Sequence, residues 1–133
     1  MTGPTVLVVG AGGQLGAAAA ERLRDRCELV ALAHADLDIT DDARVAAVVA
    51  QRRPDVVLNC AAYNAVDRAE RDAAAAFAVN AFGVDALARA AVGAGATLVH
   101  YSTDFVFDGK ATTPDVGGTS TTDGFTDAII ARL

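Results

Sequence analysis

The sequence contains few cysteines and few large aromatic residues, and it has no tryptophan. Its two cysteines, Cys27 and Cys60, lie in or beside predicted core elements and lack C-x-x-C spacing, so we interpret them as reduced and buried. The two histidines, His34 and His100, are too far apart to form a local zinc motif. We therefore predict neither a disulfide-stapled fold nor a metal site. A catalytic serine elbow and a Walker A sequence are also missing.

Basic charge is scarce as well. Eleven Lys and Arg face 17 Asp and Glu, which gives a net charge of −6 and a pI near 4.6. This balance argues against a nucleic-acid partner and against a polybasic membrane anchor. The longest apolar runs, 6–9 and 73–79, are far shorter than the ~18–20 residues of a membrane span. The first ten residues lack the basic start of a signal peptide, and we expect a cytoplasmic protein with no membrane partner.

What is present is enough apolar sequence for one folded domain. Of the 133 residues 53% are hydrophobic and 21% charged, with a mean hydropathy of +0.31. Strand patterns alternate with helix patterns. Strands are predicted at 5–9, 28–33, 56–59 and 97–102, and helices at 14–26, 41–53 and 73–94. Such alternation is typical of an α/β fold with a parallel sheet and helices on both faces.

The alternation stops after Lys110. Residues 111–124 are rich in Thr, Gly and Asp, and 125–133 are predicted to form at most a short helix. We therefore expect a domain over 1–110 and an atypical tail, a loop or disordered segment, over 111–133.

A glycine motif follows the first predicted strand and opens the first predicted helix. Gly10, Gly13 and Gly16, with Gln14 and Leu15 between them, form G-x-x-G-x-x-G. A dinucleotide site needs a tight turn here, close backbone approach to the pyrophosphate, and amide groups at the helix start. The alternative is an ordinary strand-to-helix turn, but its position between a strand and a helix favours dinucleotide binding.

The predicted fold is thus an incomplete Rossmann-type, doubly wound parallel sheet of about four strands in the order 3-2-1-4. In that order strand 97–102 is an exposed edge next to strand 5–9. An open edge favours pairing with another chain, so we expect possible self-association through 97–102.

Two further segments follow strands at the predicted ligand edge. One is Ala61, Ala62 and Tyr63, and the other contains Thr103, whose hydroxyl could bond a substrate carbonyl. At the end of the second strand neither a well-placed acid nor an arginine is evident, so the sequence leaves NAD and NADP open.

These segments together resemble the dTDP-4-dehydrorhamnose reductases, which are extended short-chain dehydrogenase/reductases. The resemblance rests on VLVVGAGGQLG, ADLDITD, RPDVVLNCAAYNAVDRAE, FAVNAFG and LVHYSTDFVFDG, in the right order over about 4–110. The regulatory β-subunit of methionine adenosyltransferase is similar too, so the resemblance does not by itself imply catalysis.

The resemblance implies a role for each matching position. Gly10, Gly13, Gln14, Leu15 and Gly16 would line the pyrophosphate, Asp38 and Ile39 would flank the adenine, and Ala61, Ala62 and Tyr63 would run beside the riboses of NADPH or NADH. Thr103 would help to hold a dTDP-4-keto-6-deoxy-sugar, which receives hydride at C4.

One departure from the family concerns the proton donor. The family carries Y-x-x-x-K beyond the threonine, but the corresponding positions here are Asp127 and Ala131, and Lys110 is the only lysine. A phenol needs a nearby cation to act as an acid near neutral pH. We therefore expect a catalytically incomplete, truncated or frame-shifted reductase. A non-catalytic dinucleotide-binding or regulatory module and an inert remnant are the alternatives.

Overall fold

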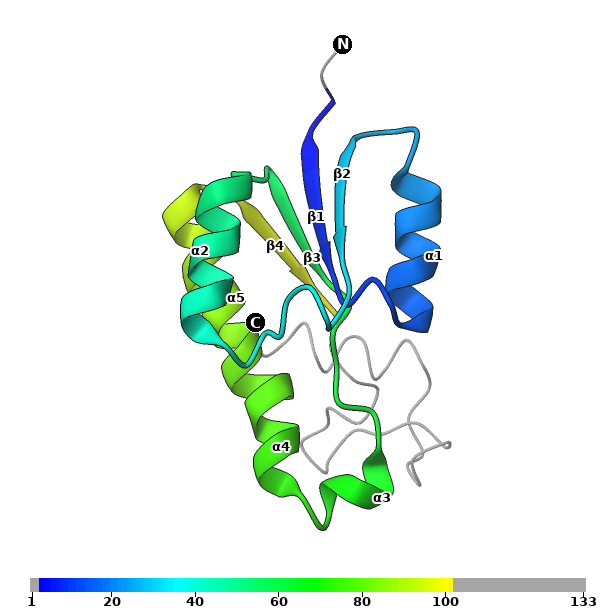
Figure 1. The fold of residues 1–133 in the computed structure, drawn as a ribbon, viewed down its shortest axis with the longest axis vertical. Coiled ribbons are helices and arrows are strands. Elements are labelled where there is room, and N and C mark those ends of the chain that lie inside the picture. The colour runs from blue at the N-terminus through cyan, green and yellow to red at the C-terminus, as the bar shows by residue number, and fades with distance from the viewer. Residues whose placement is uncertain (1–2, 102–133) are drawn as a thin grey trace, which may run out of the picture. The chain divides into compact units, whose positions relative to one another are not determined.

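The computed structural model describes residues 3–101. The predicted tail, Thr103, and Ser102 as the last residue of the predicted strand 97–102 lie outside the described residues. The described part is a four-stranded parallel sheet with helices on both faces (Figure 1). Its elements in chain order are β1 (Thr5–Val9), α1 (Gln14–Leu23), β2 (Glu28–Leu32), α2 (Asp42–Arg52), β3 (Val56–Asn59), α3 (Val66–Ala69), α4 (Ala73–Phe77), η1 (Ala78–Gly83), α5 (Val84–Ala94) and β4 (Thr97–His100).

The strands are close to their predicted bounds because β-branched and apolar runs stand between chain breakers. Pro54 precedes β3, and Gly95 ends α5 in the left-handed conformation with φ of 69°. Asp41 caps α2 by accepting a hydrogen bond from the Arg44 amide at 3.0 Å. The predicted helix 73–94 contains a π-helical stretch, η1, between its two α-helical parts.

The predicted strand order 3-2-1-4 is wrong. The observed order is β2-β1-β3-β4, so β3 pairs with β1 on the side opposite β2. The burial of the strands explains this. Val57, Leu58 and Asn59 in β3 are all buried, which requires neighbours on both sides, whereas β2 is half-exposed along its length and suits an edge. β4 is the terminal strand among the described residues, as predicted, but its neighbour is β3 and not β1.

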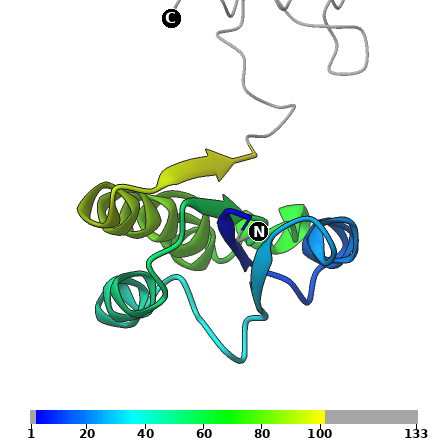
Figure 2. The same ribbon diagram turned by 90° about the horizontal axis from the view of Figure 1, so that it is seen from above.

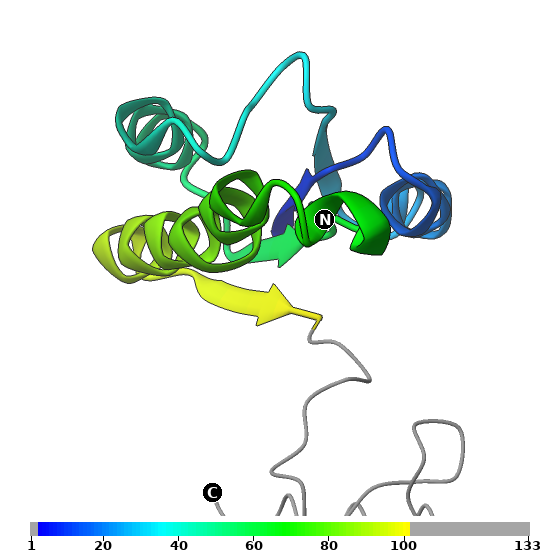
Figure 3. The same ribbon diagram turned by 90° about the horizontal axis from the view of Figure 1, so that it is seen from below.

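Two hydrophobic clusters fix the helices to the sheet. Alternate residues of β1 point to opposite faces, with Leu7 and Val9 on one and Val6 and Val8 on the other. The first face is covered by α2 and α5 and the second by α1, as Figures 2 and 3 show. Each fully buried Leu or Val stabilises the fold by roughly 1.5–3 kcal/mol, so this sandwich holds the carboxyl ends of the strands in place.

The helical stretch Ala73–Ala94 is long and apolar enough to cross a membrane by length and composition alone, with 22 residues. The length of uninterrupted apolar runs in the sequence did not reveal this. In the fold it forms the crossover between β3 and β4, and its α5 part buries Ala86, Leu87 and Ala91. Its other side carries the exposed Arg89. We therefore interpret this stretch as a helix that covers the sheet with one face and meets solvent with the other.

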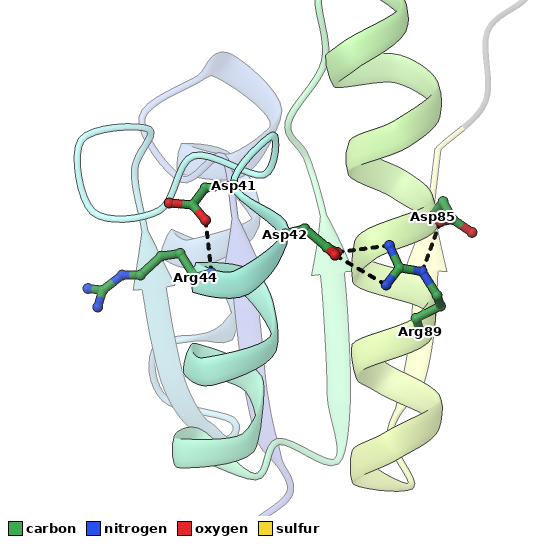
Figure 4. A network of polar contacts seen from close by, with 5 residues as sticks. All are labelled: Asp41, Asp42, Arg44, Asp85 and Arg89. Atoms are coloured by element: carbon green, nitrogen blue, oxygen red, sulfur yellow. Dashed lines mark hydrogen bonds and ion pairs between the residues drawn. The ribbon is translucent and has the colours of Figure 1, made fainter.

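Arg89 joins α5 to α2 through two carboxylates (Figure 4). Its guanidinium donates to Asp42 Oδ1 at 2.8 Å and to Asp85 Oδ2 at 2.9 Å. The hydrogen bonds that Arg89 donates to Asp42 and Asp85, and then the negative charges of these carboxylates, raise the pKa of Arg89 above its ordinary value. All three side chains are more than half exposed, so we expect the network to contribute little to stability.

Candidate functional site: the carboxyl ends of β1 and β3

The candidate site lies where β1 and β3 end side by side. The connection after β1 leads to α1 on one face of the sheet, and the connection after β3 leads through α3 and α4 to α5 on the other. The two connections therefore diverge to opposite faces of the sheet at a topological switch point. Ligands of open α/β sheets bind at such points. Figure 1 shows all four carboxyl ends at the same edge of the sheet.

Two of the three motif glycines are required by the fold itself. Gly10 has φ of +76°, and a Cβ there would stand 2.5 Å from the Ala61 amide nitrogen at the end of β3. A Cβ on Gly16 would overlap the carbonyl oxygen of Gly10. These glycines allow the turn to pass close to β3 and α1 to pack close against the turn.

Gly13 differs from the other two. A Cβ there would meet the Gly10 oxygen only at 3.5 Å, an ordinary contact, and φ is −81°. The fold therefore does not require a glycine at this position. Gly13 is the N-cap of α1, and no side chain caps the helix. The amides that open α1 at Gln14 and Leu15, which have no intrahelical acceptors, are available to an anion together with the positive end of the helix dipole.

The segment after β3 is held by two asparagines, Asn59 and Asn80, to which the sequence analysis gave no role. Asn59 is 1% exposed, accepts from the Ala61 amide at 3.0 Å and contacts His100 Nδ1 at 3.1 Å. Asn80, on η1, accepts from the Tyr63 amide at 2.8 Å and donates to the Tyr63 carbonyl at 3.1 Å.

These contacts fix the backbone of 61–63 beside the glycine turn, while Ala62 is exposed and Ala61 and Tyr63 are half-buried. The asparagine in the FAVNAFG segment could have pointed to Asn80, but its partner lies 17 residues away and no local pattern indicates it. A π-helical turn often marks a functional site, and here it presents the Asn80 side chain to Tyr63.

Asp38 and Ile39, predicted to flank the adenine, face different surroundings. Asp38 Oδ1 accepts from the Thr40 amide at 2.9 Å and from its hydroxyl at 2.8 Å. These bonds, the backbone one first, hold the pKa of Asp38 below its ordinary value, with a smaller contribution from His34. Ile39 is 3% exposed and packs in the main core, where Gly83 leaves room for its side chain. Its side chain therefore serves packing, and its predicted contact with the adenine stays a prediction.

An acid at the end of β2, which sequence spacing did not reveal, is supplied by a turn. Asp36 folds back so that its Oδ2 accepts from the Ala33 amide at 2.9 Å, while its own amide donates to the Ala33 carbonyl at 3.0 Å. The carboxylate thus stands at the strand end although Asp36 comes four residues after Leu32, the last residue of β2. An Asp in the turn that follows a strand is the signal that could have indicated it.

The two cysteines are unpaired and half-buried, less enclosed than the sequence suggested. Desolvation raises the pKa of the Cys60 thiol above its ordinary value. A raised thiol pKa opposes thiolate formation, so Cys60 is interpreted as a packing residue against the cluster of Val6, Val8 and Leu58.

Comparison with known proteins places the chain in a family. The sequence model of the RmlD substrate binding domain matches residues 4–122. The dTDP-4-dehydrorhamnose reductase of Mycobacterium tuberculosis is 47% identical over 114 residues, which are 85% of this chain and 35% of the relative. The enzyme of the same name from Streptomyces griseus is 47% identical over 112 residues, 84% of this chain and 37% of the relative.

Solved structures show the same likeness to dTDP-4-dehydrorhamnose reductases. A dTDP-4-dehydrorhamnose reductase from Bacillus anthracis, in complex with NADP, superposes with a TM-score of 0.79 at 38% identity and covers 84% of this chain and 40% of that one. The chain therefore spans somewhat more than a third of the length of these relatives. On the strength of the family match and these likenesses, the chain belongs to the RmlD substrate binding domain family, together with relatives named dTDP-4-dehydrorhamnose reductases.

Proposed function

We propose that this chain carries the cofactor-binding part of a dTDP-4-dehydrorhamnose reductase. The bound cofactor, NADPH or NADH, would supply hydride for C4 of a dTDP-4-keto-6-deoxy-sugar. The chain's own residues would bind and orient that cofactor. In this proposal the amides of Gln14 and Leu15 hold the pyrophosphate, and the backbone of 61–63 runs beside the riboses.

The observation that carries the proposal is the open space at Gly13. Gly10 and Gly16 are explained by close packing, but a side chain at Gly13 would meet no atom of the described structure closer than 3.5 Å. A glycine that the fold does not need, at the N-cap of a helix and at the switch point of the sheet, fits close approach by a phosphate group. With glycine at positions 10, 13 and 16, the turn after β1 has the shape and the free amides that a dinucleotide pyrophosphate needs.

Proton donation to the keto sugar is not assigned to any residue of this chain. The sequence has no tyrosine beyond Tyr101, and Lys110 is its single lysine. We therefore propose that these 133 residues bind the dinucleotide without reducing the sugar on their own, which keeps a non-catalytic binding module as the second candidate function. The expected sugar contact of Thr103 and the cytoplasmic location remain part of the proposal.

Binding of NADPH and NADH to the full 133-residue chain tests the proposal. Nicotinamide fluorescence should show saturable binding, and Gly13→Val should weaken it at least about tenfold, because the branched side chain keeps the phosphate from the amides that open α1. A factor of ten corresponds to ~1.4 kcal/mol, the size of one charge-assisted hydrogen bond. Gly93→Val is the matched control, since a Cβ at Gly93 would likewise meet no close atom, with nothing within 4 Å, and Gly93 lies near the C-terminal end of α5.

The outcomes separate the candidate functions. Absence of saturable binding in the wild type, or unchanged binding in Gly13→Val with the far-ultraviolet circular dichroism retained, contradicts the dinucleotide site. Turnover of the keto sugar by the chain alone contradicts the non-catalytic assignment and leaves the cofactor site standing.

A further inference from the structure

The last residues of β3 and β4 share a hydrogen bond across the sheet at its carboxyl edge. Asn59 and His100 are register partners in this parallel pair, and Asn59 Nδ2 lies 3.1 Å from His100 Nδ1. Asn59 is 1% exposed, whereas His100 is exposed. A fully buried amide is therefore joined to a ring that protons from solvent can reach.

The Ala61 amide fixes which way the Asn59 side chain points. That amide is a donor and lies 3.0 Å from Asn59 Oδ1, so Oδ1 is the accepting oxygen and Nδ2 is the nitrogen that faces the ring. Nδ2 can only donate. His100 Nδ1 is therefore the unprotonated acceptor, and the neutral ring carries its proton on Nε2.

Protonation of His100 Nδ1 breaks this arrangement. The charged ring donates from both nitrogens, so its Nδ1–H group would face the N–H groups of Asn59. A flip of the Asn59 amide would offer Oδ1 to the ring, but it would turn Nδ2 toward the Ala61 amide, again donor against donor. Either way one donor at the buried end of β3 loses its acceptor, which is unfavourable. The bond that anchors Ala61 and a proton on His100 Nδ1 therefore oppose each other.

The charged groups around β4 do not offset this effect within residues 3–101. The main elements packed against β4 are β3 and α5. β3 has no ionisable side chain, and the two on α5, Asp85 and Arg89, bond to each other. Cys60 packs against the opposite face of the sheet, and Tyr101 follows His100 in the chain. The hydrogen bond that Nδ1 accepts is therefore the main described contact that the ring's proton would disturb.

We propose that His100 is a positioning residue of the dinucleotide site, which holds the 61–63 segment through Asn59 only while its ring is neutral. The contacts run from His100 Nδ1 to Asn59 and from Asn59 to the Ala61 amide, where the segment passes beside the glycine turn. On the basis of the proposed function, a proton on His100 releases the segment and weakens cofactor binding.

Calorimetric titration of the full chain with NAD⁺ tests this dependence. The oxidised cofactor is the probe because reduced nicotinamide decomposes in acid. Wild type should bind about tenfold more weakly at pH ~5.5 than at pH ~7.5, since histidine changes charge in this range and a buried donor is then left unsatisfied. His100→Asn places an amide oxygen where Nδ1 stands and cannot be protonated, so its Kd should stay near the wild-type value of pH ~7.5 at both pH values. His100→Leu removes the acceptor and should bind about tenfold more weakly at both.

His34→Asn is the matched control. His34 is the other histidine of the chain, with its ring 84% exposed, and this variant should keep the wild-type pH dependence. Amide NMR spectra of the chain without cofactor follow the contact directly. The signals of the Ala61 amide and the Asn59 side chain should move together with the His100 ring as the pH falls in wild type, and should stay in place in His100→Asn.

The outcomes separate the role of His100 from the cofactor site itself. Ala61 and Asn59 signals that do not follow the His100 ring, wild-type pH dependence in His100→Asn, or unchanged binding in His100→Leu overturn the role of His100 while the dinucleotide site stands. Loss of the pH dependence in His34→Asn overturns it as well, because the effect then belongs to that ring. Absence of saturable binding to wild type overturns the proposed function and the effect on the cofactor, whereas the amide signals still decide whether His100 holds the segment.

Discussion

The three motif glycines should differ sharply when each is replaced by alanine. Gly10→Ala places a side chain in a left-handed conformation, which costs about 1–2 kcal/mol, and drives its Cβ to 2.5 Å from the Ala61 nitrogen. Gly16→Ala forces its Cβ onto the Gly10 carbonyl. Overpacking of this kind costs typically ~1–3 kcal/mol, so we expect each variant to lose about 3 kcal/mol of unfolding free energy.

Gly13→Ala should be nearly neutral by comparison. Its Cβ makes an ordinary contact at 3.5 Å. An N-cap alanine is less favourable than glycine, by up to about 1 kcal/mol, and the smaller entropy of the unfolded chain offsets part of this by ~0.4–1 kcal/mol. The net change should stay below about 1 kcal/mol.

Urea unfolding followed by circular dichroism measures all three variants. With an m value of ~1–3 kcal/mol/M for a small protein, the Gly10 and Gly16 variants should unfold at clearly lower urea or fail to fold, and the Gly13 variant close to wild type. A loss of stability in Gly13→Ala equal to that of the other two would refute the reasoning, because the fold would then require all three glycines.

Three further changes have defined outcomes. Thr40→Val removes the hydrogen bond from the Thr40 hydroxyl to Asp38 and leaves the backbone bond, so the pKa of Asp38 should rise toward its ordinary value in an NMR titration. Because the pKa of Asp38 is lowered in the folded state, the stability that its ionised form confers is present above the unfolded-state pKa of ~3.9. That stability is lost as the pH falls through the folded-state pKa. An unchanged pKa contradicts this. Gly95→Ala should destabilise the fold by about 1 kcal/mol in thermal unfolding, because the backbone φ at Gly95 is 69°. Gly93→Ala lies in open space within α5 and should stabilise the fold by about 0.5 kcal/mol. Equal effects of the two substitutions would disprove the argument from backbone conformation. Asp41→Ala should cost about 1 kcal/mol through loss of the α2 cap and Asp41→Asn only a few tenths, and the cap is unimportant if the two variants unfold alike.

The strand and helix bounds could be predicted because they depend on local chemistry. The apolar run 5–9 between Pro4 and Gly10, and the run 56–59 after Pro54, each allow little other than a buried strand. The order of the strands could not be predicted in the same way. It depends on which side of β1 the chain takes after β2, and the structure shows the contrast in the buried Val57, Leu58 and Asn59 of β3 against the half-exposed β2.

The site was predictable where it depends on backbone shape and not where it depends on distant side chains. The glycine spacing indicated the turn after β1 directly. The side-chain oxygens of Asn59, Asn80 and Asp36 accept hydrogen bonds from backbone amides of a nearby turn or of a distant segment, and neither composition nor periodicity records such bonds.

The central claim is that the turn after β1 and the segment after β3 together hold a dinucleotide. The most direct measurement is the backbone amide NMR spectrum of the full chain titrated with NADH. The largest shift changes should fall at residues 11–16 and 61–63, with saturation at one common Kd. Changes confined to other segments, or a spectrum that does not respond to the cofactor, would contradict the account.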